Sequence, residues 1–204
     1  MVWSFEFFIK EAGTTHVISW RQDLTDWGLG ATESQCTAWL ALSPATSQSG
    51  CMRFVAGSHK NAIVPHRDTF DDNNLLSRGQ EIAVDVDEAE ATLIELCPGQ
   101  MSLHHGLMFH ASGPNRSADR RIGVAIRYVT PEVKQEVADR DYAMPVRGVD
   151  RFGNFSHLSA PEELFAPRSL RIYDEIRAEQ AKALAQGATH VKLYAKRSEA
   201  SAAG

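Results

Sequence analysis

Cysteines are few, basic residues are not in excess, and no long apolar run is present. The three cysteines, Cys36, Cys51 and Cys97, are widely spaced and form no CxxC pair. This argues against a zinc ribbon or a disulfide framework and favours buried, reduced thiols in a cytoplasmic protein. The net charge of -5 argues against a nucleic-acid surface. No segment is apolar enough to span a membrane, and residues 1–13 lack the pattern of a signal peptide.

The rest of the composition is typical of a globular protein. The chain has 204 residues, of which 43% are hydrophobic and 23% are charged, which suits one domain with a sizeable core. Short apolar segments alternate with Gly, Pro, Ser and Asn turns. We predict strands at residues 3–9, 15–22, 37–42, 52–55, 91–96, 101–103, 107–111 and 122–129. Many short strands with such turns favour an all-β sandwich or jelly roll over a βαβ fold.

The last third of the chain changes character. Residues 167–186 show helical periodicity, with a proline and a glycine at suitable ends. We therefore predict a β domain at residues 1–155 and a C-terminal helical extension at 156–204. The polar segment 68–86 is predicted to cover or line a site and to contain a short helix at 73–79.

The segment Trp20-Arg-Gln-Asp23 ends a predicted strand. Residues two apart on a strand share a face, so a His-x-Asp at this place would aim an imidazole and a carboxylate at one point. A distant histidine could complete a facial triad for iron(II). Asp23 and the distal candidate His110 are present, but Arg21 stands where the first histidine would be.

An arginine follows His110 at the start of the next predicted strand. Arg121 could form two parallel hydrogen bonds with a carboxylate. Such an anchor is what the far carboxylate of 2-oxoglutarate needs. The competing assignment is Arg120, and the structural alternative for Arg121 is a surface pair with Asp119.

Five blocks in order carry a resemblance to the phytanoyl-CoA dioxygenase family. They are Trp20-Arg-Gln-Asp23, Thr37-Ala-Trp-Leu-Ala-Leu42, Gly50-Cys-Met-Arg-Phe-Val-Ala-Gly-Ser-His-Lys60, Pro98-Gly99, and His105-Gly-Leu-Met-Phe-His-Ala-Ser-Gly-Pro-Asn-Arg-Ser117 with Arg121 beyond. The resemblance implies a double-stranded β-helix, the cupin-like jelly roll, that holds iron(II) and 2-oxoglutarate. Members also have a portion before the first predicted strand, so this chain resembles a fragment or an alternative-start product.

The resemblance also implies roles for individual residues. Asp23 and His110 would be metal ligands, and Arg121 would anchor 2-oxoglutarate. Ser112, Trp39 and Lys10 would bind or wall the co-substrate. The pattern departs from the family at Arg21, because a protonated guanidinium has no lone pair to give a metal.

Three accounts of Arg21 remain open at this level. The chain is a non-catalytic relative, or Arg21 is a single-base change in an ordinary enzyme, or another residue such as His16 or His59 supplies the ligand. In each case we expect Arg21 to pair with Asp23 and to weaken iron binding.

A substrate pocket is predicted from residues that flank the metal motifs. We assign His59, His105 and Trp27 to it as candidates. His104 and His105 are neighbours on one predicted strand, so they face opposite ways. We expect His105 near the site and His104 on the outside.

The function predicted from these features is an iron(II)- and 2-oxoglutarate-dependent dioxygenase. It would hydroxylate a small organic substrate, and it would bind neither nucleic acid nor membrane. The alternative is a non-catalytic, carboxylate-binding module on the same fold. A zinc hydrolase would need three ligands and a positioned base, a set that these motifs do not offer.

Overall fold

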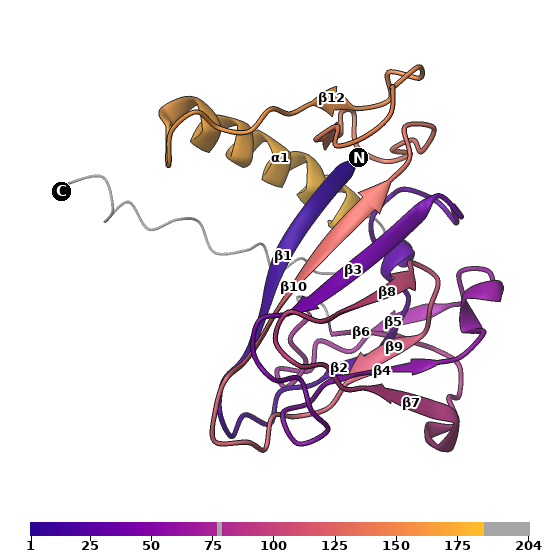
Figure 1. Cartoon of the computed structure of the whole chain (residues 1–204). Helices are drawn as coiled ribbons and strands as arrows, with labels where there is room; N and C mark the ends of the chain where they lie inside the picture. The colour runs from indigo at the N-terminus through magenta and orange to yellow at the C-terminus, as the bar shows by residue number, and fades with distance from the viewer. Residues whose placement is uncertain (77–78, 186–204) are drawn as a thin grey trace.

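Two four-stranded antiparallel sheets form the body of the protein in a computed structural model that describes residues 1–76 and 79–185 (Figure 1). The first sheet has the order β1-β10-β3-β8 and the second has the order β2-β9-β4-β7. The first contains β1 (Val2–Lys10), β10 (Arg121–Val129), β3 (Gln35–Ala41) and β8 (Met101–His105). The second contains β2 (Ile18–Arg21), β9 (His110–Ser112), β4 (Met52–Val55) and β7 (Ala91–Ile94). The predicted all-β architecture with mostly antiparallel pairing is confirmed.

The chain crosses between the two sheets repeatedly. Strands β1, β3, β8 and β10 belong to one sheet, while β2, β4, β7 and β9 belong to the other. Side chains alternate along each strand, so every second residue points between the sheets. On β10, for example, Arg121, Ala125 and Val129 are buried while Tyr128 is exposed. The site described below is built from these inward positions.

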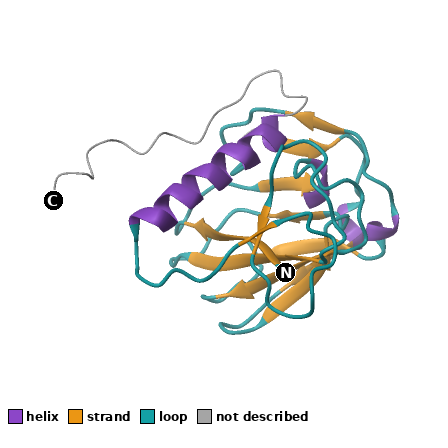
Figure 2. Ribbon diagram, turned by 90° about the horizontal axis from the view of Figure 1, so that it is seen from above, coloured by secondary structure: helices purple, strands orange, loops and turns teal. Residues whose placement is uncertain are grey.

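Smaller elements surround the sheets. They are β5 (His66–Asp68) paired with β6 (Gln80–Ile82), β11 (Tyr142–Ala143) paired in parallel with β12 (Ser156–His157), and the 3-10 turns η1 (Asp23–Thr25), η2 (Ser58–Lys60) and η3 (Glu88–Glu90). Helix α1 (Pro167–Ala185) lies along one side of the strands (Figure 2). Its start confirms the prediction at Pro167, and the predicted end at residue 186 lies outside the described residues.

The helix predicted at residues 73–79 is wrong for the part of that segment the structure describes. Asn74 instead forms a parallel bridge with Val17, and the amide of Leu75 donates to the carbonyl of Val17 at 2.9 Å. The segment therefore extends the edge of the sheet at β2. This pairing joins residues far apart in sequence, which local helix propensity does not report.

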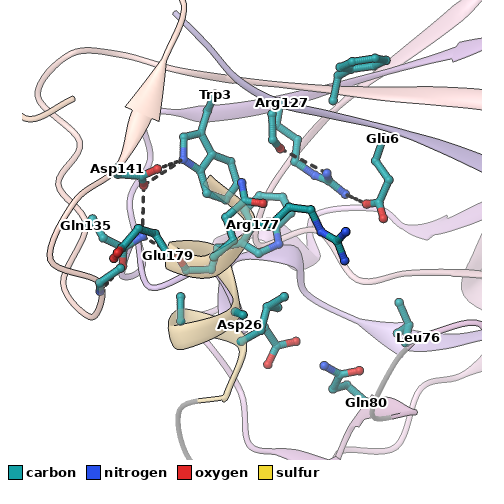
Figure 3. Close-up of a pocket in the computed structure, with 18 of the residues that line it drawn as sticks. Trp3, Glu6, Asp26, Leu76, Gln80, Arg127, Gln135, Asp141, Arg177 and Glu179 are labelled. Carbon is teal, nitrogen blue, oxygen red and sulfur yellow. Dashed lines mark hydrogen bonds and ion pairs between the residues drawn. The ribbon is translucent and has the colours of Figure 1, made fainter. Parts of the chain in front are cut away.

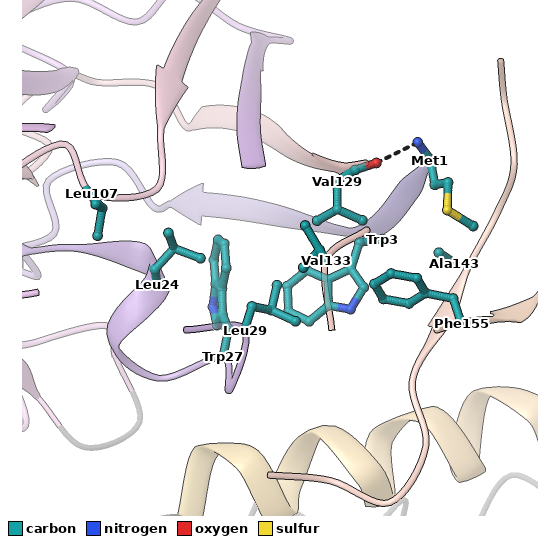
Figure 4. Packing of buried hydrophobic residues seen from close by; sticks show 10 residues of the cluster. All are labelled: Met1, Trp3, Leu24, Trp27, Leu29, Leu107, Val129, Val133, Ala143 and Phe155. Carbon is teal, nitrogen blue, oxygen red and sulfur yellow. Dashed lines mark hydrogen bonds between the residues drawn. The ribbon is translucent and has the colours of Figure 1, made fainter. Parts of the chain in front are cut away.

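The largest apolar cluster lies at one end of the sheets (Figure 4). It joins β1, the η1 turn and the segment after β10 through Met1, Trp3, Leu24, Trp27, Leu29, Leu107, Val129, Val133, Ala143 and Phe155. The rings of Trp3 and Trp27 lie 5.1 Å apart, and the indole of Trp3 donates to Asp141 at 2.9 Å. Because Leu24 lies in η1 and Trp27 lies two residues after it, this cluster fixes the turn that carries Asp23.

In the described part of the chain, no helix has both the length and the apolar character needed to cross a membrane. The cysteines were expected to be buried thiols: Cys51 is buried, but Cys36 is half-buried and Cys97 is exposed, so the expectation is wrong for Cys97.

Candidate metal centre

Asp23 is the centre of a buried group of polar side chains. Its Oδ1 lies 3.0 Å from Nη2 of Arg21 and 3.5 Å from Nε2 of His110. Its Oδ2 lies 3.8 Å from Nε2 of His104. Asp23, His104 and His110 each offer one ligand atom, and these atoms all lie within 4.8 Å of one another. The expected pairing of Arg21 with Asp23 is present.

Strand pairing and one glutamine hold this group in place. Arg21 at the end of β2 is paired with His110 on β9. Gln22, between Arg21 and Asp23, is fully buried. Its Nε2 donates to the carbonyls of Ala62 and Leu107, at 3.1 and 3.0 Å, and its Oε1 accepts from the amide of Val64 at 2.9 Å. The motif analysis assigned no role to Gln22, although a fully bonded amide between two site residues positions both.

Charges around Asp23 keep it ionised. Burial alone would raise the pKa of its carboxyl group, but the charges of His110 and Arg21 and the nearby ring of His104 hold that pKa well below its usual range. The Nδ1 of His110 lies 2.9 Å from the carbonyl of Met108, which can only accept, so this nitrogen carries the proton. The Nε2 of His110 is therefore the nitrogen that faces the carboxylate of Asp23.

A small cavity of about 40 Å³ adjoins this group between the sheets. Its walls include Trp39, Ser112 and Arg121, together with Asp23, His104 and His110. The guanidinium of Arg121 is 1% exposed, lies 5.2 Å from the ring of Trp39, and donates through Nη1 to the carbonyl of Gly50 at 3.0 Å. Its Nε has no hydrogen-bond partner, and no carboxylate pairs with it within residues 1–76 and 79–185. Burial lowers the pKa of Arg121 to about 10, so it remains a buried cation.

The neighbouring residue Arg120 has a different environment. It is paired with Glu11 on the surface at 2.8 Å, where both side chains are exposed. Of the two candidate anchors, only Arg121 reaches the cavity.

Lys10 is buried beside the same cavity. Its Nζ donates to Oγ of Ser112 at 2.7 Å and also to the carbonyl of Gly113. Burial, followed by the charges of Arg121 and Arg53, lowers the pKa of Lys10 to about 7 against an opposing effect of Cys51. Lys10 also faces Arg121 across the β1–β10 pair. The cavity therefore concentrates positive charge near Ser112.

A fully buried asparagine shapes the loop between His110 and Arg121. Asn115 donates through Nδ2 to the carbonyls of Lys10, Glu11 and Asp119, at 3.2, 3.1 and 2.8 Å. Its Oδ1 accepts from the amide and hydroxyl of Ser117. The loop therefore brings the end of β1 to the start of β10.

A larger cleft of about 500 Å³ lies between β1, the η1 region and α1 (Figure 3). Trp27, one of the predicted pocket residues, is on its wall. Arg127 forms an ion pair with Glu6 at 3.2 Å and lies 4.8 Å from the ring of Trp27. Phe8, Arg21 and Arg127 line both the cleft and the small cavity. The cleft therefore meets the Asp23 group at Arg21.

The two histidines of β8 face the opposite way from the prediction. His104 is 5% exposed and points at Asp23, so its predicted outward position is wrong. His105 is half-buried, accepts from the amide of Leu107 at 3.0 Å, and lies 6.0 Å from the ring of His59. Exposed Met101 and Leu103 share the face of His105. His59 and His105 thus form a pair that lines neither the small cavity nor the cleft.

The other histidine considered as a third ligand is outside this group. His16 is exposed and its Nδ1 lies 3.0 Å from the hydroxyl of Thr14. Among the described residues, the group with metal-ligand spacing contains His104 instead of His16 or His59.

Comparison with known proteins places these features in a family. The family model described as phytanoyl-CoA dioxygenase (PhyH) matches residues 1–123. A probable phytanoyl-CoA dioxygenase of Caenorhabditis elegans is 26% identical over 55% of this chain and 36% of its own length. A probable alpha-ketoglutarate-dependent hypophosphite dioxygenase of Stutzerimonas stutzeri is 28% identical over 69% of this chain and 46% of its own. The chain thus spans less than half the length of either relative.

A solved structure is similar over more of the chain. The non-heme monooxygenase ThoJ, in its apo form, is 37% identical with a TM-score of 0.80, over 91% of this chain and 66% of its own. Its nickel complex gives 33% identity and a TM-score of 0.72 over the same shares. Since the family model covers more than half of the residues, the chain belongs to the phytanoyl-CoA dioxygenase family.

Proposed function

We propose that the protein is an iron(II)- and 2-oxoglutarate-dependent oxygenase that hydroxylates a small organic molecule. The observation that carries this proposal is Arg121, a buried cation without a carboxylate partner in the described residues, in the same cavity as Asp23 and His110. An unpaired buried charge is costly, so the cavity favours an anionic ligand. The relative in Stutzerimonas stutzeri is named as an alpha-ketoglutarate-dependent dioxygenase and ThoJ as a non-heme monooxygenase, and both names support an oxygenase.

We further infer that the two sheets are those of a double-stranded β-helix. Successive strands of the two large sheets alternate between them, except that β4 and β7 both lie in the second sheet, and the orders β1-β10-β3-β8 and β2-β9-β4-β7 place β1 beside β10. Residues 1–155 would form this domain, with 156–204 as an extension. The burial of Phe155 in the main cluster and the position of α1 outside the sheets support that division.

The charges fit a dianionic co-substrate. Arg121, Arg21 and the titratable Lys10 surround a cavity that has Asp23 as its carboxylate. Arg121 would bind the far carboxylate, Ser112 would be held by Lys10 as a hydroxyl partner, and Trp39 would wall the ligand. The small cavity must widen to admit a whole co-substrate.

Asp23 and His110 would hold iron(II). An ionised carboxylate and an imidazole whose Nδ1 is held by a backbone carbonyl suit that metal. Bound there, iron(II) would supply the activation of oxygen. The substrate would enter through the cleft. Arg21, which lines both the cleft and the small cavity, would face the substrate.

Binding and turnover of 2-oxoglutarate test this function. We expect calorimetry to show binding in the presence of iron(II), and succinate to form with a suitable substrate. Arg121→Met should abolish binding, whereas Arg120→Met, which removes the surface neighbour, should not. Equal binding by both variants and the parent would contradict the proposal.

One observation favours a second candidate, the non-catalytic carboxylate-binding module. The Arg21–Asp23 ion pair of 3.0 Å occupies part of the metal site. For this candidate, 2-oxoglutarate would bind equally with and without metal, and Arg21→His would be needed to make binding metal-dependent.

We also propose that the protein is cytoplasmic, which its free thiols support.

A further inference from the structure

We propose that His104 replaces the missing histidine as a metal ligand, so that Asp23, His104 and His110 form the metal centre. This inference rests on the proposed function. It moves one ligand from the end of β2, where Arg21 stands, to β8 in the opposite sheet. Two imidazoles and one carboxylate remain the donor set, which is the set that non-haem iron(II) sites use.

The first support is the geometry of the three donor atoms. The Nε2 of His104 lies 3.8 Å from Oδ2 of Asp23, and the Nε2 of His110 lies 3.5 Å from Oδ1. The two imidazole rings are 5.4 Å apart and tilted at 47°. A metal with bonds of about 2.1 Å needs its ligand atoms about 3 to 4 Å apart. Small side-chain movements would close these three atoms around one ion.

The second support is the cost of burying His104. Its side chain is 3% exposed and packs 5.0 Å from the ring of Phe54, and its Nδ1 has no hydrogen-bond partner in the described part of the chain. A hydrophobic side chain would fill this place without an unsatisfied polar atom. The free energy of binding an ion at Nε2 would offset this cost of burial.

Arg21 is compatible with this centre. A carboxylate has about four lone-pair positions, and the nearest contact of Arg21 is with Oδ1, which also lies 3.5 Å from Nε2 of His110. The other oxygen, Oδ2, faces His104. With lone pairs on both oxygens, Asp23 can hold Arg21 and still offer a lone pair to a metal. Arg21 then acts as a positioning residue for the carboxylate.

Metal titration of the full chain tests the inference without relying on turnover. Cobalt(II) is the probe, followed by calorimetry and by its visible absorption, which reports the ligand set. We expect the parent to bind one equivalent, and His104→Phe to weaken binding by about tenfold or more, the range seen when support of a metal ligand is lost. His105→Phe, which changes the adjacent outward-facing residue, is the matched control and should bind as the parent does.

Two further variants guard against a folding defect. His104→Gln keeps a polar side chain of similar size and should also lose affinity and change the absorption. Adding Arg21→His to His104→Phe should restore binding, because it returns a histidine to the end of β2. Unchanged cobalt affinity and absorption in both His104 variants would overturn the inference and leave the proposed function standing.

The proposed function has its own separate failure. If the parent binds cobalt(II) through His104 but no variant binds or turns over 2-oxoglutarate, then the metal centre stands and the oxygenase does not. If the parent binds no metal and Arg21→His alone restores binding, then His104 is not a ligand and the inference fails. The proposed oxygenase function would still stand for the Arg21→His variant.

Discussion

Arg21 and Asp23 form a buried ion pair in which each residue depends on the other. Arg21 is 8% exposed and Asp23 is 5% exposed, so neither charge has water to replace its partner. Breaking a buried pair from one side leaves an uncompensated charge, which costs far more than losing an exposed pair. The pair therefore contributes to folding as well as to the site.

Removal of the Arg21 charge should destabilise the protein. We expect Arg21→Met to lower the free energy of unfolding by about 3 to 5 kcal/mol at pH 7 without metal. Urea denaturation followed by tryptophan fluorescence measures it. Lys182→Met, which removes an exposed partner of Glu179 and Asp139, is the control and should have little effect. An equally small loss of stability in both variants would show that the buried charge of Asp23 does not need Arg21 as its partner.

Lys10 should make stability depend on pH. Its pKa is about 7 in the folded protein, against an ordinary value of 10.5. Between these values the unfolded chain binds a proton that the folded chain does not, so the free energy of unfolding rises with pH there. The groups that face Lys10 are Arg121, Arg53 and Cys51.

Comparison with Lys10→Met isolates this effect. We expect the parent to gain stability relative to the variant as pH rises from 7 toward 10, by at most about 1.4 kcal/mol per pH unit. Denaturation at a series of pH values measures the difference, with the exposed Lys134→Met as control. A difference that falls over this range would contradict the shifted pKa.

At the scale of elements, β10 and β3 join through a close contact. Gly123 on β10 lies against the ring of Trp39 on β3, and a Cβ atom at this glycine would overlap that ring. The contact lets the indole lie flat beside Arg121, 5.2 Å away. The backbone of Gly123 has no unusual φ angle, so glycine is needed here because of the Trp39 ring and not because of the conformation of β10.

Gly123→Ala should disturb both stability and ligand binding. We expect a loss of about 1 to 3 kcal/mol from overpacking, together with weaker 2-oxoglutarate binding because Trp39 moves against Arg121. Calorimetry and denaturation measure the two effects. Gly113→Ala is the control, since nothing lies within 4 Å of its added Cβ. Combining Gly123→Ala with Trp39→Phe should recover part of the stability.

Element positions were predicted from sequence better than side-chain directions. The strand predicted at residues 52–55 is β4, and the start predicted for the helix at Pro167 is that of α1. Both elements could be predicted because their periodicity and their flanking turn residues lie within a short stretch of sequence. The directions of His104 and His105 were reversed, because a strand pattern gives alternation but not which face is inward. Leu103 and Met101 are exposed, so the face of β8 that His105 shares with them is apolar but uncovered.

The site was predicted in part. Arg121, Asp23 and His110 come together in the structure, since their motifs include the strand ends that place them. Gln22 and His104 were missed as site residues. Gln22 is fixed by Ala62, Val64 and Leu107, distant contacts that no short motif encodes.

At the scale of the whole molecule, the outer face of the first sheet is apolar. Two rows cross β1, β10, β3 and β8: Phe5, Ile126, Ala38 and Leu103, and Phe7, Val124, Leu40 and Met101. Ala38 and Val124 are buried within these rows, whereas Phe5 is 61% exposed and Leu103 is 66% exposed. A contiguous patch of this kind is uncommon on a monomer and favours association.

We expect this chain to self-associate as its concentration rises. Phe7→Glu should shift sedimentation velocity profiles toward the monomer, because the charge falls within the apolar rows. Val149→Glu, at an exposed site away from the sheet, is the control and should leave the profile unchanged. A monomer at every concentration tested would sink this prediction.

The linker before α1 gives the molecule a point of entry for proteases. Leu164 and Phe165 are 89% and 76% exposed, and Phe165 has a φ of 56°. Chymotrypsin should therefore cut here and leave α1 held by contacts that include Lys182 with Asp139 and the buried Ala183. Because α1 forms one wall of the large cleft, a ligand in that cleft should slow release of the cut helix. Retention of the fragment on a sizing column would then report which compounds occupy the cleft before any reaction is known.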